Sequence, residues 1–414
     1  MKKPSWFARV GPWGVVGLLW VATLFRDMDR NVLATLREPI LGDVPMTEGQ
    51  FGLVASAFMW VYGLISPVCG FLSDRYGRRR IIFVSVLTWS AVTWLTGQMH
   101  SFHGLFLTRA LMGLSEACYL PAALALITDY HRATRARAVA VHNSGIYLGA
   151  ALGGLGGYVA IAIGWRQCYS LLGLFGIAYA FVLMLMLRDA PVEAPAAGLT
   201  APGPIDIRGA WRELSVQRGF WKLALVNGLL CVGSATIATW MPTFFRERFH
   251  LGIGLAGASS ISYLQVGYFV SGMLGGLWSD LWARRNPRGR MLVPALGFCL
   301  AAPGLLLVSV SPALGLALLG IGFYALARGF FDVSTMPIMR ELIAGRYIAT
   351  GYGLVNLVGS FTGAAMVTLS GVLRDHGVGL QFTFQLSAVA LLLGALLLFG
   401  LRPRGGPATI GGRG

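Results

Sequence analysis

Twelve apolar stretches of about 20 residues follow one another along this chain, and each is long enough to cross the hydrocarbon core of a bilayer as a helix. The chain of 414 residues is 56% hydrophobic and 12% charged, and soluble domains carry about twice this fraction of charge. These features predict an all-α membrane protein. We place the twelve transmembrane helices at residues 12–36, 50–73, 80–99, 103–130, 138–163, 166–187, 220–245, 254–280, 290–310, 313–340, 348–373 and 380–401.

Positive charge is abundant but dispersed. The formal net charge is +16, yet the arginines and lysines lie mostly in short loops between the spans, so we do not expect nucleic acid as a partner. With both termini inside, the inner segments hold 24 of the 33 lysines and arginines and the outer loops hold five. The positive-inside rule therefore predicts cytoplasmic termini. We expect a monomer in a bacterial-type inner membrane, without a cleavable signal peptide.

A stretch rich in proline, alanine and glycine separates the sixth span from the seventh. Residues 190–198 and 201–204 hold four of the prolines, which is typical of a linker, and we expect a short amphipathic piece around Trp211. We therefore divide the chain into an N-terminal six-helix bundle at 1–187, a cytoplasmic linker at 188–219 and a C-terminal six-helix bundle at 220–414.

A short motif occurs twice, in the loops after the second and the eighth span. Its pattern is Gly-x-x-x-Asp-x-x-x-Arg-Arg, and Asp74 and Asp280 are 206 residues apart, close to half of the chain. This offset indicates an internal repeat. A plain basic loop that sets topology is the alternative, but it does not require the same spacing twice. The motif residues are Gly70, Asp74, Arg75, Gly77, Arg78 and Arg79 in the first copy, and Gly276, Asp280, Arg284 and Arg285 in the second.

This motif resembles the signature loop between helices 2 and 3 of the major facilitator superfamily, and its second copy resembles the degenerate loop between helices 8 and 9. The resemblance implies two pseudo-symmetric six-helix bundles that rock around a central site. It also implies that the charged motif residues form a cytoplasmic latch. Other matched positions support the repeat, since Glu116 and Asp332 are each followed, five residues later, by a proline.

Apart from charges near the span ends, eight charged residues lie within the predicted spans. Each costs at least about 2.5–3.5 kcal/mol near a helix centre, so they must pair or face a polar cavity. Arg109 and Glu116 are seven residues apart, which places them on one face but about 10 Å apart, too far for a direct pair. A structural salt bridge between helices is the alternative to a functional role. The eight residues are Arg26, Asp27, Asp29, Arg30, Arg109, Glu116, Arg328 and Asp332.

Spacing predicts pairs along single helices. On the first span, Arg26 and Asp29 are three residues apart, as are Asp27 and Arg30, so they can neutralise one another. On the tenth span, Arg328 and Asp332 are four residues apart. The alternative for both sets is therefore a self-compensated ion cluster with no role in binding.

These residue types suit transport of an anion together with a proton. Arginine stays charged and offers a planar fork that matches a carboxylate or a phosphate. A carboxyl group removed from water holds a proton more readily, and an arriving anion alters the field of a nearby arginine. No metal, nucleotide or other cofactor is needed, and we expect no enzymatic activity. The five cysteines lie in apolar segments without metal-like spacing, so we expect buried free thiols at Cys69, Cys118, Cys168, Cys231 and Cys299.

The pair Asp29-Arg30 together with Arg109-x6-Glu116 is similar to the anion:cation symporter branch of the superfamily, which includes bacterial sugar-acid symporters and vesicular and lysosomal organic-anion carriers. This resemblance implies that Asp29 and Glu116 are protonation sites, that Arg109 meets the substrate anion, and that Arg30 couples the two. It implies a proton-coupled symporter of a small organic anion. The stretch Glu116-Ala-Cys-Tyr119 is also similar to the spinster family, which implies lysophospholipid or another amphipathic lipid as the alternative substrate.

Other polar and aromatic residues of the spans are weaker candidates for lining the binding cavity. Packing or anchoring at the membrane interface is the alternative for each of them. A receptor or scaffold would not need ionisable residues at mid-membrane in both halves, so we do not favour that class. The additional substrate-binding candidates are Tyr62, Tyr119, Tyr147, Asn227, Trp240, Tyr263, Arg328, Asp332 and Asn356.

Overall fold

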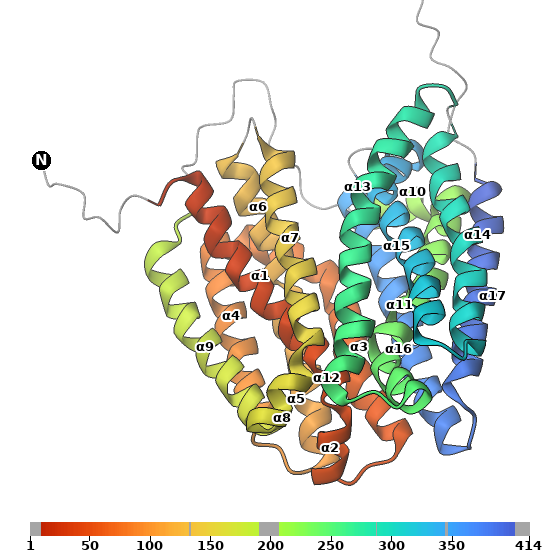
Figure 1. Ribbon diagram of the computed structural model, residues 1–414. Helices are drawn as coiled ribbons and strands as arrows, with labels where there is room; N and C mark the ends of the chain where they lie inside the picture. The colour runs from red at the N-terminus through yellow and green to blue at the C-terminus, as the bar shows by residue number, and fades with distance from the viewer. Residues whose placement is uncertain (1–9, 132–133, 190–206, 287, 344–346, 402–414) are drawn as a thin grey trace, which may run out of the picture.

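The computed structural model of the protein describes residues 10–131, 134–189, 207–286, 288–343 and 347–401. Within these ranges the regular elements are all helical, which confirms the predicted fold class. The helices that precede the linker and those that follow it form two bundles side by side (Figure 1). Most of the predicted linker lies outside the described residues.

Each predicted span corresponds to one long helix or to a run of consecutive helices. The twelve units are α1 Pro12–Thr35, α3 Glu48–Tyr76, α4 Arg78–Thr96, α5 Phe102–Ala117 with α6 Tyr119–Tyr130, α7 Arg135–Gly154 with α8 Gly156–Ile163, α9 Trp165–Met186, α11 Arg218–Phe249, α12 Ile253–Gly257 with the π-helical turn η2 Ala258–Ser262 and α13 Tyr263–Ala283, α14 Gly289–Val310, α15 Leu314–Leu342, α16 Ile348–Asp375 and α17 Leu380–Phe399. Two short helices complete the fold, α2 Arg37–Asp43 and α10 Ile207–Ser215. Helix α10 confirms the short piece expected around Trp211.

Most of these units have the length and apolarity of a membrane span. Among the described residues, nine helices meet that description, or ten when α7 and α8 are counted as one span bent by 44°. The remaining two units are α1, which carries four charged residues, and α4, which begins with three arginines. The charges of α1 are those that the sequence analysis places at mid-membrane. The arginines of α4 are those that it places at the loop motif.

The fourth span is interrupted beside a buried carboxylate. Helix α5 ends at Ala117 and α6 begins at Tyr119. Pro121 lacks the N–H group that would donate to the carbonyl of Ala117, so the hydrogen-bond ladder is broken there. Glu116 is the residue just before the break, and it lies halfway along the span Phe102–Tyr130.

The two bundles meet closely at the end of the molecule that carries α2, α8 and α12, which we call the α2 end (Figure 1). A Cβ atom added to Gly257 of α12 would lie 2.3 Å from the carbonyl oxygen of Gly154 in α7. A Cβ atom at Gly371 of α16 would lie 2.4 Å from the carbonyl oxygen of Glu48 in α3. Glycine is needed at both places because only a hydrogen fits between the backbones.

Ion pairs join the bundles at the α2 end. Arg246 of α11 pairs with Glu38 of α2, and Nη2 of Arg374 lies 3.3 Å from Oε1 of Glu48. Asp375 accepts hydrogen bonds from the backbone N–H groups of Glu48, at 2.8 Å, and of the next residue, at 2.9 Å. These contacts close the α2 end.

The repeated motif lies at the opposite end, where Gly77 separates α3 from α4 with φ of 84°, a backbone conformation that glycine adopts without strain. Arg78 pairs with Asp129 and donates to the carbonyl of Ala125 at 2.9 Å. The backbone N–H of Arg79 donates to Asp189 at 2.9 Å. Arg284 and Arg285 are exposed at the end of α13. Gly70 and the side chains of Asp74, Arg75 and Asp280 lie outside the described part, so the latch stays a prediction.

Candidate functional site

Four charged side chains of α1 and α5 form one cluster, which we call the Glu116 cluster. Nη2 of Arg26 lies 2.6 Å from Oδ2 of Asp27, and Nη1 of Arg30 lies 3.8 Å from Oδ1 of Asp27. Oε2 of Glu116 lies 3.2 Å from Nε of Arg30 and 4.0 Å from Nε of Arg26. Two arginines therefore balance two carboxylates.

The members of this cluster differ in their access to solvent. The side chain of Glu116 is 1% exposed, whereas that of Arg30 is 25% exposed. The guanidinium of Arg30 lies 4.0 Å from the ring centroid of Phe58 and 5.0 Å from that of Tyr62, both on α3, which is within the range of a cation–π contact. Glu116 accepts no hydrogen bond on either oxygen within the described structure. Its charge is thus balanced by arginines alone, and one of these can be reached from outside.

A second group, the Asp29 cluster, joins α1, α4, α5 and α9 through an electrostatic interaction between Asp29 and Arg109. Thr93 donates a hydrogen bond to Oδ2 of Asp29. Nη2 of Arg109 donates to the hydroxyl of Tyr169 at 2.6 Å, and its Nη1 contacts Sδ of Met112 at 3.0 Å. Oδ1 of Asp29 and Nε of Arg109 make no hydrogen bond to described residues. Both charged groups are buried, with 3% of each residue exposed.

The pairing along α1 differs in part from the prediction. The expected pair of Asp27 and Arg30 is confirmed. Arg26 pairs with Asp27 instead of Asp29, because the carboxylate of Asp29 is held by Thr93 on another helix. Arg109 and Glu116 belong to different clusters, which agrees with the separation predicted from their spacing.

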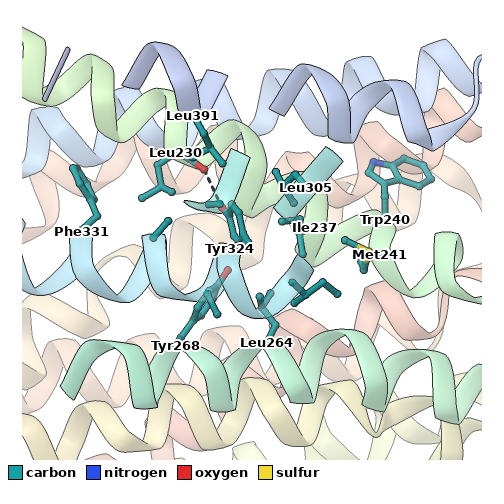
Figure 2. Packing of buried hydrophobic residues seen from close by; sticks show 14 of the residues in the cluster. Leu230, Ile237, Trp240, Met241, Leu264, Tyr268, Leu305, Tyr324, Phe331 and Leu391 are labelled. Carbon is teal, nitrogen blue, oxygen red and sulfur yellow. Dashed lines mark hydrogen bonds between the residues drawn. The ribbon is translucent and has the colours of Figure 1, made fainter. Parts of the chain in front are cut away.

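The second bundle has its own ion pair, halfway along the span Leu314–Leu342. Nε of Arg328 lies 2.8 Å from Oδ2 of Asp332, and the two side chains are 27% and 35% exposed. Arg328 also donates to Oγ of Ser234 at 3.1 Å, which lies 2.6 Å from the hydroxyl of Tyr324. Figure 2 shows Tyr324 within the apolar core of this bundle, where its hydroxyl reaches the carbonyl of Leu230 at 3.2 Å. The pair expected from spacing is therefore confirmed.

Comparison with known proteins identifies the fold that carries these clusters. Residues 19–365 match the sequence profile of the Major Facilitator Superfamily. The chain belongs to this superfamily. A solved structure of a bacterial homologue of the human lysosomal transporter Spinster, in an inward-facing and occupied conformation, superposes with a TM-score of 0.79 at 21% identity, over 95% of this chain and 97% of that one.

Curated relatives within the Major Facilitator Superfamily are named as transporters of organic anions. A "probable sulfoacetate transporter" of Cupriavidus necator is 24% identical over 94% of this chain and 93% of its own. A "probable galactarate/D-glucarate transporter" of Escherichia coli is 27% identical over 66% of each chain. The hexuronate transporter of Bacillus subtilis is 23% identical over 93% of this chain and 92% of its own.

In the structure of this superfamily member, the weaker candidates for substrate binding lie at several separate places. Tyr119 is fully buried with its ring centroid 5.5 Å from the guanidinium of Arg26. Tyr147 of the first bundle packs edge-on against Phe269 of the second at 6.1 Å between centroids. Asn227 is 8% exposed and donates to the carbonyl of Val355 at 2.9 Å.

The remaining three candidates are Trp240, Tyr263 and Asn356. Trp240 is fully buried at the α2 end, where Arg37 and Arg374 lie 5.9 and 5.7 Å from its ring centroid. Tyr263 is 42% exposed, which suits a helix surface that faces lipid. Asn356 is partly buried and interacts with Tyr352 of the same helix.

Two hollows of the described structure lie away from the ion clusters. One, of about 450 Å³, lies at the α2 end and is lined by charged residues that include Arg37, Glu38, Arg246 and Glu247. The other, of about 580 Å³, is an apolar groove between α1, α8 and α9 that is bordered by Phe25, Val32 and Phe175, among others. No group of three potential metal ligands occurs among the residues that the structure describes.

Sequence reasoning missed Thr93 and Tyr169, which hold Asp29 and Arg109. Each is a single polar residue in a span, and many single polar residues in membrane helices only pack or bond to their own backbone. A possible signal is the excess of carboxylates and arginines on α1 and α5, because each of these buried groups requires a donor or acceptor from a neighbouring helix.

Proposed function

We propose that this protein is a secondary transporter that carries a small organic anion, such as a sugar acid or another carboxylate, together with a proton. The relatives named above transport sulfoacetate, galactarate, D-glucarate or hexuronates, which share a negative charge on a small polar skeleton. A positive side chain at mid-membrane is the group that such a cargo requires.

The single observation that carries the proposal is the contact between Arg30 and Glu116. Arg30 is partly exposed and Glu116 is buried, with 3.2 Å between Nε and Oε2. A substrate carboxylate that binds the exposed face of Arg30 competes with Glu116 for the same cation. Glu116 then loses part of its compensation in a poorly solvated place and takes up a proton, because the neutral form costs less there.

The Asp29 cluster supplies a second carboxyl and a second arginine, both buried. Asp29 keeps one oxygen without a hydrogen bond, and Arg109 keeps one free N–H, among the described residues. We propose Asp29 as the second protonation site and Arg109 as the inner contact of the anion. The hydroxyl of Tyr169 holds Arg109 at 2.6 Å until the anion arrives.

We propose that transport proceeds by alternating access, and the arrangement of the bundles supports this. In the state described, ion pairs and close helix crossings hold the α2 end closed. We propose that the opposite end, which carries the repeated motif, faces the cytoplasm, in agreement with the distribution of arginine and lysine. Breaking the contacts at the α2 end and forming latch contacts at the motif end would give the outward-open state.

Transport in proteoliposomes tests the proposal. Purified protein is reconstituted, and uptake of radiolabelled D-glucarate, a hexuronate and sulfoacetate is measured with and without an inward proton gradient. We expect the gradient to drive accumulation and substrate to carry protons inward. The Glu116→Gln variant should retain exchange of substrate across the membrane but lose gradient-driven accumulation. Accumulation that survives in this variant would remove Glu116 from the coupling mechanism.

The apolar groove between α1, α8 and α9 favours a second candidate function, transport of a lysophospholipid or another amphipathic lipid. Its volume of about 580 Å³ suits an acyl chain, and its walls include residues of the same helix as Arg30. Under this function, lysophospholipid raises the melting temperature of the purified protein and D-glucarate does not. The reverse result favours the organic anion.

A further inference from the structure

His142 lies on α7 and faces α1, and neither ion cluster includes it. The residue is fully buried. Its Nε2 atom lies 2.8 Å from Oγ1 of Thr23, and this oxygen lies 3.0 Å from the hydroxyl of Tyr119. The hydroxyl of Tyr119 in turn reaches the carbonyl of Leu19 at 2.8 Å. The four groups form an unbroken hydrogen-bonded chain from α7 through α1 to α6.

This chain can run in either of two directions. If Nε2 of His142 carries a proton, it donates to Thr23, which donates to Tyr119, which donates to the carbonyl of Leu19. If Nε2 has no proton, it accepts from Thr23, and the hydroxyl of Tyr119 turns toward Thr23 and leaves the carbonyl. The presence of a hydrogen on Nε2 of His142, which depends on both the tautomer and the charge of the ring, therefore decides where the hydroxyl of Tyr119 points.

The chain ends beside the Glu116 cluster. The ring of Tyr119 lies 5.5 Å from the guanidinium of Arg26, and Arg26 interacts with Asp27 and Glu116. Tyr119 is also the first residue of α6, just past the interruption that follows Glu116. A change at Tyr119 thus acts on the arginine that compensates the buried carboxylates.

The charge of His142 acts on Arg26 in addition to the direction of the hydrogen bonds. The charged and titratable groups that face His142 are Arg26 and Asp27 from α1 and Tyr119 from α6, and Asn143 is its polar neighbour on α7. A positive imidazole repels Arg26 and moves it toward the carboxylates. Histidine is the side chain that changes charge most readily between about pH 5 and 8.

We propose that His142 is a further proton-binding residue of this protein and that it positions Arg26 through Thr23 and Tyr119. Protonation of His142 and of Glu116 is then coupled, and the coupling is reciprocal. The inference rests on the proposed function for its role in transport, because there the proton on Glu116 accompanies the anion. The coupling itself needs no substrate.

Nuclear magnetic resonance of the full-length protein in lipid nanodiscs tests the coupling directly. Histidine is labelled with ¹⁵N, and the signals of His142 are assigned as those lost in His142→Gln. We expect His142 to change tautomer or charge as the pH is lowered. Glu116→Gln removes a carboxylate that partly compensates Arg26, so the positive charge of Arg26 acts more strongly on His142. The titration midpoint of His142 should then move to lower pH by at least about half a pH unit. In the Thr23→Val background the same substitution should move it by less than half as much.

His131 provides the matched control. It is also buried, at 4% exposure, and it also contacts a threonine, with 3.0 Å between its Nδ1 and Oγ1 of Thr134. Its ring packs edge-on against that of Trp13, with 4.6 Å between centroids, and it is not part of the hydrogen-bonded chain of His142. We expect its NMR signals at each pH to be the same in the wild type and in Glu116→Gln. A His142 signal that does not titrate, or that titrates identically in both proteins, overturns the proposal.

The pH profile of uptake gives the functional readout. His142→Gln keeps an N–H group that can donate to Thr23 but cannot titrate. The rate at the optimal pH should therefore stay within about twofold, while the acidic limb of the profile flattens. His131→Gln should leave the profile unchanged. An unchanged profile in His142→Gln contradicts the role in transport. Coupled titration without any uptake of organic anions contradicts the proposed function and leaves the inference standing.

Discussion

Nε of Arg30 lies 3.2 Å from Oε2 of Glu116, across the contact of α1 with α5. The two side chains differ sharply in exposure, at 25% and 1%. One end of this ion pair is therefore open to a competing anion, and the other is not. Arg26, at 4.0 Å, is the remaining cation beside Glu116, so release of Arg30 weakens the compensation without abolishing it.

Removal of Arg30 alone should destabilise the protein more than removal of the pair. Arg30→Ala leaves a buried carboxylate with only Arg26 beside it, and breaking such a pair costs about 3 kcal/mol. We expect a marked fall in the melting temperature in detergent. In the double variant with Glu116→Gln the uncompensated charge is gone, and most of the loss should be recovered. A double variant that melts below Arg30→Ala would show that Glu116 is not the partner that matters.

Closure of the α2 end should depend on the pair of Arg246 and Glu38. Both side chains are partly exposed, at 39% and 44%, so the pair contributes at most about 1 kcal/mol, or about a fivefold change in the population of the closed state. Glu38→Arg should shift spin-label distances between α2 and α12 toward longer values. Combining it with Arg246→Glu should restore them. Distances that stay long in the double variant would mean that the charges do not hold this end closed.

Closure of the α2 end should respond more strongly to a substitution at Gly257 than to loss of the pair of Arg246 and Glu38. In Gly257→Ala the new methyl group would lie 2.3 Å from the carbonyl oxygen of Gly154, so the bundles must separate there. We expect the same distance measurement to report an open α2 end. Gly252→Ala is the control, because nothing lies within 4 Å of the added atom. If both variants remain closed, the crossing is less tight than the structure indicates.

The spans, their number and the repeat could be predicted because apolar length and charge placement are properties of the sequence alone. The pairing of Asp27 with Arg30 and of Arg328 with Asp332 followed from helical spacing. Contacts between helices could not be predicted in the same way. Thr93 and Tyr169 reach their partners only through the packing of α4 and α9, and no spacing rule connects residues on different spans.

Pairing on α1 illustrates the same limit within one helix. Spacing allowed Arg26 to bind Asp29, but Asp29 accepts from Thr93, and Arg26 binds its neighbour Asp27. The competing partner came from another helix. Position along a helix therefore restricts the possible pairs, and tertiary packing selects among them.

Tyr169→Phe should lower the stability of the protein without ligand but increase the stabilisation by a substrate anion. The substitution removes the hydroxyl that accepts from Nη2 of Arg109 at 2.6 Å, and a buried donor left without a partner costs about 1–3 kcal/mol. The melting temperature without ligand should therefore fall. If the substrate anion binds Arg109, it no longer competes with the tyrosine, so the stabilisation produced by D-glucarate should grow.

Tyr179→Phe is the matched control, since this tyrosine lies on the same helix and its hydroxyl donates to the carbonyl of Leu18 at 2.7 Å. It should lower the melting temperature without enlarging the effect of ligand, because its hydroxyl holds a backbone group and not a candidate anion contact. Equal responses to D-glucarate in the two variants would exclude Arg109 as the residue that receives the anion. The positive charge that compensates the cargo would then have to come from Arg30 or Arg328, whose side chains are 25% and 27% exposed.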